Sequence, residues 1–253
     1  MRILFFGNNW LAWKVIEWLR GQNEQIVGLV LHPNGKRKFG EEIIRCAGIN
    51  DSCIFDGSQL RQPEVIQSIQ HFRPDIGLSI LFGYIVKKEV LDLLPQGCIN
   101  LHPALLPYNR GAYPNVWSIV EQTRAGTTIH YMDEGVDTGD IIAQREVEVE
   151  PIDTGESLYR KLETASLELF IETWPRILSG KAPRQAQLKD EGTYHRAADV
   201  EKVDEINLDQ SYTARELINI LRARTFESYR GAYFIQENRR VYLQLKLEYE
   251  TSE

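Results

Sequence analysis

The sequence has few of the features that mark proteins acting on nucleic acids. Acidic residues outnumber basic ones, 36 Asp and Glu against 29 Lys and Arg, which leaves a formal net charge of -7. Nucleic-acid binders usually carry a basic excess or a basic stripe. The densest basic cluster, GKRKFG at 35–40, is followed directly by Glu41 and Glu42, so we interpret it as a solvated loop. We therefore expect no nucleic-acid partner.

Long apolar runs, paired cysteines and clustered histidines are missing as well. No stretch reaches the roughly 18–20 apolar residues that a membrane span needs, and the apolar N-terminus MRILFFGNN is too short for a signal-peptide core. The three cysteines, Cys46, Cys53 and Cys98, lack CxxC spacing, and the five histidines are scattered singly. These patterns predict a cytoplasmic protein with reduced thiols, no membrane contact and no metal site.

What is present is the apolar pattern of a doubly wound α/β domain. Near-continuous apolar runs, typical of strands buried on both faces, occur at 2–7, 26–32 and 75–82. The segments between these runs have apolar side chains at helical spacing, and Pro63 suits the first position of one such helix. Further strands are expected at 97–102, 127–132 and 141–150, followed by a helix over 157–178 that Gly180 ends. The order predicts a mostly parallel, Rossmann-like sheet.

A change in composition after Pro183 predicts a second, smaller region. The chain becomes polar there, then offers a helix, TARELINILRA, in which Thr213 and Glu216 stand in capping-box relation. Two short strands, GAYFIQ and RVYLQLKLEYE, follow around a turn at 237–239. We therefore expect a catalytic domain at 1–185 and a small α+β appendage at 186–253.

Polar residues just beyond the strands are the first candidates for a site, because doubly wound sheets bind ligands there. Asn100 and His102 are two residues apart at a strand end, so their side chains project to the same face. An amide and an imidazole together offer a donor for an oxyanion and a group that moves protons near neutral pH. On spacing alone, a capping Asn100 and a His102 bonded to a backbone carbonyl are an equally good interpretation.

Two glycine-containing loops need separate interpretation. GNNWLAW, after the first strand, lacks the second and third glycines of G-x-G-x-x-G, so we reject a dinucleotide site. Asp137 lies in EGVDTGD, where glycines permit close approach of the backbone to a ligand. An Asx-turn is the alternative for that aspartate.

The combination of these motifs resembles a known family. INLHPALLP, the loop YNRGAYPNVWSI and AGTTIHYMDEGVDTGDII together resemble the formyltransferases that depend on 10-formyltetrahydrofolate. The family pattern is an Asn-x-His pair followed, tens of residues later, by an Asp in a VDTG or VDAG loop, and the resemblance covers roughly residues 1–180. It implies that Asn100 donates to the oxyanion, that His102 takes or passes the proton of the attacking amine, and that Asp137 orients His102.

The resemblance also implies a pterin site between two loops. Its residues here are Phe82, Gly83, Tyr84 and Ile85 from the first loop, and Val136 and Asp140 from the second. The co-substrate is 10-formyltetrahydrofolate, and no metal is implied. Plain core packing is the alternative for Phe82 and Ile85. His130, on the strand before the second loop, is interpreted as a core or supporting histidine rather than a catalyst.

The acceptor that the resemblance favours is a nucleotide-linked 4-amino-4,6-dideoxy sugar of lipopolysaccharide or surface-glycan biosynthesis. Asn9, Arg110 and Tyr113 are the expected substrate contacts. Residues 190–253 carry 9 Lys and Arg against 13 Asp and Glu, which argues against RNA. A homodimer would be ordinary at this size. Two alternatives stay open: a methionyl-tRNA formyltransferase with a reduced C-terminal domain, and a non-catalytic folate- or nucleotide-binding module.

Overall fold

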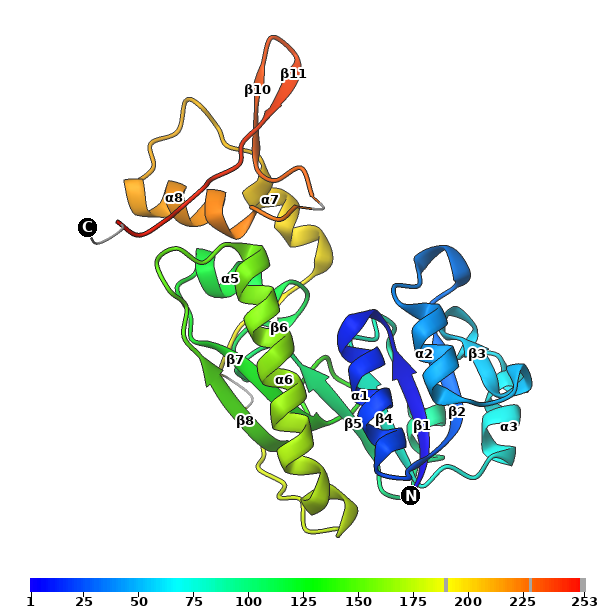
Figure 1. The fold of residues 1–253 in the computed structure, drawn as a ribbon. Coiled ribbons are helices and arrows are strands. Elements are labelled where there is room, and N and C mark those ends of the chain that lie inside the picture. The colour runs from blue at the N-terminus through cyan, green and yellow to red at the C-terminus, as the bar shows by residue number, and fades with distance from the viewer. Residues whose placement is uncertain (189–190, 228, 251–253) are drawn as a thin grey trace. The chain divides into compact units, whose positions relative to one another are not determined.

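The protein is built on a seven-stranded sheet with the order β3-β2-β1-β4-β5-β7-β8 (Figure 1). The structure is a computed structural model that describes residues 1–188, 191–227 and 229–250. The strands of this sheet are β1 (Arg2–Gly7), β2 (Gln25–Leu31), β3 (Ile54–Asp56), β4 (Ile76–Ile80), β5 (Cys98–His102), β7 (Ala125–Tyr131) and β8 (Ile141–Val147).

Strand directions confirm the expected fold class. The pairs β1–β2, β2–β3, β1–β4 and β4–β5 are parallel, whereas β7 runs antiparallel to β5. The strand order reverses at β1, which has β2 on one side and β4 on the other. In such sheets the crevice at the reversal, beyond the carboxyl ends of the strands, is where ligands bind.

Alternation along β1 explains why both faces of the sheet are covered. Ile3 and Phe5 belong to one core, and Leu4 and Phe6 belong to another. The first core includes buried side chains of α1 (Asn9–Gly21), α2 (Gly40–Ala47) and the second half of α6 (Gly155–Leu178). The second includes Ile69 of α3 (Pro63–His71) and Val90 of α4 (Lys88–Leu91). A strand buried on both faces has to be apolar throughout, as the sequence of β1 is.

The chain divides into two compact units whose limits differ from a single boundary at residue 185. Unit 1 comprises Met1–His102, Thr128–Gln144 and Ser166–Lys189, and unit 2 comprises Pro103–Thr127, Arg145–Ala165 and Asp190–Glu253. Unit 2 has a core of its own, formed by Val116, Trp117, Ile119, Ala125, Leu158, Leu162, Val200 and Ala223. The C-terminal region, through Val200 and Ala223, therefore shares a core with residues 116–125 and 158–162.

The tail of unit 2 contains the helix and hairpin that the sequence predicts. The helix α8 (Ala214–Ala223) starts from a capping box of Thr213 and Glu216, and β10 (Tyr233–Gln236) pairs with β11 (Arg239–Tyr242) in antiparallel fashion. The second strand is shorter than RVYLQLKLEYE suggests. Short elements also occur in this unit: β6 (Arg110–Gly111), β9 (Tyr194–His195), the 3-10 helix η4 (Ala197–Val200) and α7 (Glu201–Asp204).

One stretch expected to be a loop is partly helical. PNVWSIV forms α5 (Pro114–Val120), with Pro114 at the first helical position and six of its side chains buried. Because the helix is buried on nearly all sides and is only two turns long, its sequence shows no amphipathic pattern. Three further 3-10 helices, η1 (Asn34–Lys36), η2 (Asp51–Cys53) and η3 (Gly57–Gln59), complete the described elements.

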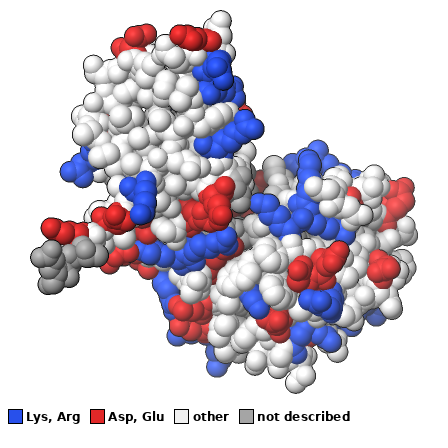
Figure 2. Space-filling model, turned by 45° about the horizontal axis from the view of Figure 1, so that its top comes forward, with Lys and Arg blue, Asp and Glu red and all other residues white. Residues whose placement is uncertain are grey.

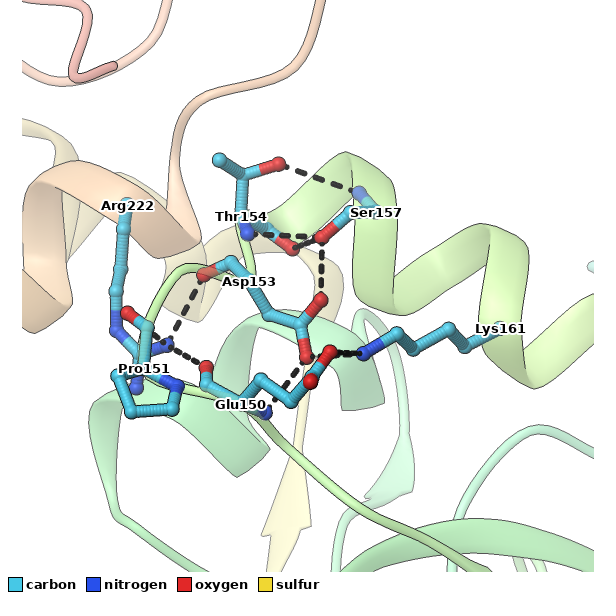
Figure 3. Close-up of polar contacts among 7 residues, drawn as sticks. All are labelled: Glu150, Pro151, Asp153, Thr154, Ser157, Lys161 and Arg222. Carbon is cyan, nitrogen blue, oxygen red and sulfur yellow. Dashed lines mark hydrogen bonds and ion pairs between the residues drawn. The ribbon is translucent and has the colours of Figure 1, made fainter. Parts of the chain in front are cut away.

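A dense polar cluster ties α8 to the start of α6 within unit 2, as Figure 3 shows. Arg222, only 9% exposed, donates through Nη1 to the carbonyl oxygens of Glu150 at 3.0 Å and Asp153 at 3.0 Å. The Asp153 carboxylate accepts from Lys161 Nζ at 2.8 Å and from Ser157 Oγ at 2.7 Å. We call these five residues the Arg222 cluster.

Among the described helices, none has the length and apolar character that crossing a membrane requires.

Candidate active site

Three predicted catalytic residues meet at the carboxyl end of β5. Asn100 and His102 alternate with the buried Leu101 along the strand, so both project to the same face. On the antiparallel neighbour β7, His130 pairs with Asn100 in register. The loop after β7 then brings Asp137 back to this point. Residues 37 positions apart in the chain are thereby placed in contact.

The polar contacts converge on the carboxylate of Asp137. Asn100 Nδ2 donates to Asp137 Oδ1 at 3.2 Å, and His102 Nε2 lies 3.6 Å from Asp137 Oδ2. His102 is 6% exposed and the Asp137 side chain 12% exposed. A carboxylate that is nearly buried beside an imidazole fixes the orientation of the ring and stabilises its protonated form. The pair is therefore suited to accepting a proton from an attacking amine.

His130, which the sequence suggests is a supporting residue, belongs to the same cluster. Its Nδ1 lies 2.8 Å from the carbonyl oxygen of Tyr131, which only accepts, so Nδ1 carries the proton. The lone pair on Nε2 then accepts from Asn100 Nδ2 at 3.1 Å. Cross-strand pairing with Asn100 is the signal that sequence reasoning lacked, because the register of β5 and β7 is a tertiary fact.

The amide of Asn100 is oriented by these two acceptors. A carbonyl oxygen in the place of Nδ2 would face the carboxylate of Asp137 and the lone pair of His130, so the nitrogen belongs there. Both hydrogens of Nδ2 are engaged in this arrangement. Donation to an oxyanion therefore requires that one of these two bonds be exchanged for the new acceptor.

Asp137 sits in a tightly folded loop and in a left-handed conformation, with φ of 55°. Asp133 Oδ1 accepts from the Gly135 amide at 2.9 Å and from Thr138 Oγ1 at 2.7 Å. A Cβ added to Gly139 would lie 1.9 Å from the carbonyl oxygen of Tyr131, so no larger residue fits there without movement of the backbone. A non-glycine residue at positive φ is strained by about 1–2 kcal/mol, and the surrounding bonds hold it in place.

The predicted pterin residues lie in two loops of the same unit, and they differ in exposure. Ile85 is 55% exposed, and Gly83 is also exposed. Phe82 packs on Phe6, with ring centroids 5.4 Å apart, and on Tyr84 at 5.6 Å. Exposed apolar surface beside open backbone fits one face and one edge of a flat pteridine. Phe82 is both a core residue and a support for this loop.

A histidine that sequence reasoning did not select orders the first pterin loop. The amide of Gly83 donates to His32 Nε2 at 3.2 Å, and the His32 ring stands edge-on to Tyr84 at 5.0 Å. Burial lowers the pKa of His32 from 6.5, Lys36 lowers it further, and Asp56 opposes them. A neutral His32 keeps the lone pair that Gly83 needs.

In the second pterin loop, Val136 and Asp140 are both half-buried. Arg184 Nη1 lies 3.8 Å from Asp140 Oδ2, and the Tyr131 amide donates to the carbonyl oxygen of Asp140 at 2.9 Å. The backbone of Asp140 thus helps to shape the loop, while its carboxylate points toward an arginine. Whether either residue contacts a pterin stays a prediction.

The three expected substrate contacts lie in different units. Asn9, at φ of 73°, belongs to unit 1, where its amide donates to the carbonyl oxygen of Lys38 at 3.1 Å. Arg110 and Tyr113 belong to unit 2. Arg110 is only 9% exposed and donates to the carbonyl oxygen of Glu191 at 3.3 Å, whereas Tyr113 is 40% exposed. Within the described residues, no group of three or more His, Cys, Asp or Glu is placed to hold a metal ion.

Residues 1–174 match the Formyl transferase family model, and residues 199–249 match the N-formyltransferase dimerization C-terminal domain. The chain belongs to the formyl transferase family. It is a folate-dependent N-formyltransferase, so the alternative of a non-catalytic binding module is rejected.

Curated relatives of the enzyme overturn the expected acceptor. A methionyl-tRNA formyltransferase of Clostridioides difficile (strain 630) is 34% identical over 88% of this chain and 73% of its own length. A second, from Bacillus subtilis (strain 168), is 32% identical over 87% of this chain and 71% of its own. The prediction of a nucleotide-linked 4-amino-4,6-dideoxy sugar was therefore wrong as the main assignment, and the alternative fits these relatives better. The length and charge of the C-terminal tail do not determine the acceptor, because neither depends on what the residues around Asn100, His102 and Asp137 bind.

Solved structures cover nearly the whole enzyme. A 4-N formyltransferase from Francisella tularensis superposes with a TM-score of 0.82 at 31% identity, covering 98% of both chains. A formyltransferase from Anoxybacillus kamchatkensis, solved with UDP-4,6-dideoxy-4-formamido-L-AltNAc and tetrahydrofolate, superposes with a TM-score of 0.57 at 30% identity. That alignment covers 80% of this chain and 89% of the other.

Proposed function

We propose that the enzyme transfers the formyl group of 10-formyltetrahydrofolate to the amine of methionyl-tRNA, with Asn100, His102 and Asp137 as its catalytic residues. The observation that carries the chemistry is the convergence of an amide, an imidazole and a carboxylate at the end of β5. The curated methionyl-tRNA formyltransferases support the acceptor. The proposal places the reaction in the cytoplasm, where charged tRNA is made.

In this mechanism the acceptor amine attacks the formyl carbon, and the folate supplies that carbon on N10. His102 accepts a proton from the attacking nitrogen, and Asp137, 3.6 Å from its Nε2, stabilises the imidazolium. Asn100 turns one Nδ2 hydrogen to the developing oxyanion, while His130 or Asp137 keeps the other. Collapse returns a proton to N10 of the leaving folate, so the C–N bond formed replaces the one broken.

The two pterin loops have complementary tasks in this proposal. Gly83 supplies exposed backbone and Ile85 an exposed apolar side chain, while the half-buried Tyr84 and Phe82 support them. Val136 and Asp140 flank Asp137 in the second loop. A pteridine held by both loops would have its formyl group beside the catalytic residues.

Binding of a tRNA by a chain of net charge -7 has to rely on local positive charge. Lys and Arg side chains lie in small groups among Asp and Glu on the face that Figure 2 shows. The densest sequence cluster, Lys36, Arg37 and Lys38, lies in unit 1, and both lysines are exposed. We expect Lys36→Glu and Lys38→Glu to weaken tRNA binding and to flatten its salt dependence.

The deciding experiment compares acceptors with 10-formyltetrahydrofolate as donor. Methionyl-tRNA, glycinamide ribonucleotide and nucleotide-linked 4-amino-4,6-dideoxy sugars are supplied separately, and formylated product is measured by mass spectrometry. We expect turnover on methionyl-tRNA, abolished by His102→Ala. Turnover on an amino sugar with none on methionyl-tRNA would overturn the acceptor. Full turnover by the His102→Ala variant would overturn the assignment of catalytic residues.

We further infer that residues 199–249 pair two copies of the enzyme, as their match to a dimerization domain suggests. Ile235 and Val241, in the β10–β11 hairpin, are 48% and 40% exposed in the single chain. Burial of such side chains is what a homodimer interface provides. Light scattering should give twice the chain mass, and Ile235→Asp should give the chain mass. A wild-type monomer at high protein concentration would rule out this pairing.

A further inference from the structure

The segment that follows α6 runs beside the loop of Asp137 in unit 1. Gln185 pairs with Ile141 through both backbone bonds, at 2.8 and 3.0 Å, in an antiparallel bridge. Arg184 stacks on the ring of Tyr131, 3.5 Å from its centroid. These two contacts align residues 184–187, which we call the strap, along the end of β7 and the start of β8.

The side chain of Gln187 bonds the strap to the loop that carries Asp137. Its Nε2 donates one hydrogen to the carbonyl oxygen of Asp137 at 2.9 Å and the other to the carbonyl oxygen of Gly139 at 2.8 Å. Two carbonyls that are two residues apart are thus held by a single nitrogen. Only a primary amide or a cation has two hydrogens to give in this way.

The bonds matter because of the backbone conformation they constrain. Asp137 has φ of 55°, which a residue with a Cβ adopts at a cost of about 1–2 kcal/mol. Gly139 has no room for a Cβ against the carbonyl oxygen of Tyr131. Within the loop, the Gly135 amide and Thr138 Oγ1 donate to Asp133 Oδ1, so these bonds close the turn from one side of Asp137 to the other. Gln187 holds the carbonyls of Asp137 and the residue two positions later, from outside the loop.

We propose that Gln187 is a positioning residue for formyl transfer, which fixes the carboxylate of Asp137 against Asn100 and His102 by pinning the carbonyls of Asp137 and Gly139. The inference rests on the proposed catalytic role of Asp137. Gln187 acts through that carboxylate and touches no reacting atom. Gln187 matters through geometry: Asp137 Oδ2 already lies 3.6 Å from His102 Nε2, so a small further displacement would break this contact. Misplacement by about 1 Å is enough to reduce turnover about 100-fold.

The test compares Gln187→Ala and Gln187→Glu with Gln185→Ala. The last is a matched control, because Gln185 has the same side chain in the same segment and is exposed while its backbone makes the bridge. Each variant is assayed with 10-formyltetrahydrofolate and the acceptor that the wild type uses. We expect Gln187→Ala to lower kcat by about 10- to 100-fold, with KM for the folate nearly unchanged. Gln187→Glu, which presents a carboxylate to two carbonyls, should lose more, and Gln185→Ala should match the wild type.

A double-mutant cycle separates positioning from a general loss of structure. If Gln187 acts through Asp137, the change Gln187→Ala has no further effect on the residual rate of an Asp137→Ala variant. A loss that is just as large in that background, or a kcat of Gln187→Ala equal to the wild type, would overturn the proposal. Should Gln187→Ala fail to fold, Gln187→Glu provides the same cycle at equal side-chain volume. An Asp137→Ala variant with full activity would instead refute the proposed catalytic set.

Discussion

Two polar clusters of the enzyme use similar side chains but differ in the distances between their polar atoms. In the Arg222 cluster of unit 2, the carboxylate of Asp153 accepts at 2.7 and 2.8 Å, and Arg222 donates to the carbonyl oxygens of Glu150 and Asp153 at 3.0 Å and to that of Pro151 at 3.4 Å (Figure 3). In unit 1, three nitrogen atoms lie farther from the Asp137 carboxylate: Asn100 Nδ2 at 3.2 Å, His130 Nε2 at 3.5 Å and His102 Nε2 at 3.6 Å. The first cluster has short bonds that fix a structure. The second has longer contacts between groups that, in the proposed mechanism, exchange partners during the reaction.

The position of each cluster in the fold explains the difference. The Arg222 cluster joins α8 to the start of α6 and contains none of the residues proposed for the chemistry, so short bonds there do not restrict the reaction. The Asp137 cluster is formed by side chains that project from the antiparallel strands β5 and β7 and by the loop that follows β7. Polar side chains that leave the end of β5 are placed where sheets of this kind bind ligands. The difference suggests that the first cluster is required for stability and the second for turnover, and substitutions can test each half of this statement.

The largest effect is expected from His102. We expect His102→Ala to lower kcat by about 10²- to 10⁴-fold, because it removes the group that takes the amine proton. The melting temperature should change little, since the contact with Asp137 is long. Steady-state kinetics and thermal unfolding measure both quantities. His71→Ala is the control, since His71 is an exposed histidine on α3. A loss of stability as large as that expected for Arg222→Met would contradict the distinction between the two clusters.

Arg222 should show the opposite pattern. Arg222→Met leaves the carbonyls of Glu150, Pro151 and Asp153 without their donor, and we expect a loss of about 3 kcal/mol in unfolding free energy. Burial lowers the pKa of Arg222, and the negative charge of Asp153 opposes that shift. Denaturant unfolding compares it with Arg215→Met, an exposed arginine on the same helix. A variant as stable as this control would show that the cluster contributes nothing.

A smaller effect is expected from the capping box at the start of α8, a local contact that also contributes to stability. Thr213 Oγ1 accepts from the Glu216 amide at 3.2 Å, and Glu216 Oε2 accepts from the Thr213 amide at 2.8 Å. Thr213→Ala should cost about 1 kcal/mol of unfolding free energy, with kcat unchanged. Ser211→Ala, two residues earlier and exposed, is the control. An identical unfolding free energy for both variants would show that tertiary packing alone holds α8.

The smallest effect concerns His32, whose contacts are long like those of the active site. Its pKa in the folded enzyme is lower than the ordinary 6.5, chiefly because of burial. The stability it contributes is therefore complete above pH 6.5 and is lost as the pH falls toward the lowered value. The free energy of unfolding is measured at about pH 7.5 and about pH 5.5. Its decline between the two should be smaller for His32→Gln, which still offers an oxygen to Gly83, than for the wild type. A decline as steep in this variant as in the wild type would assign the pH dependence to other groups.

Much of the fold could be predicted because local patterns carry it. The apolar strands, the helix begun by Pro63 and the capping box at Thr213 all appear where the sequence places them. The helix α5 did not, because its two turns follow Tyr113, which has φ of 57°. The partition into two units was equally hidden, since 103–127 and 145–165 share a core with the tail only through packing.

The sequence by itself determined the alternation that covers the sheet on both faces, the Asn-x-His pair on one side of a strand, and the glycines that shape the loop of Asp137. Tertiary structure alone decided that His130 faces Asn100, that His32 supports Gly83, and that Gln187 reaches two carbonyls 50 and 48 residues away. The physical reason is range. Periodicity and backbone preferences act over a few residues, whereas the register of β5 with β7 and the path of the strap are set by how whole elements pack.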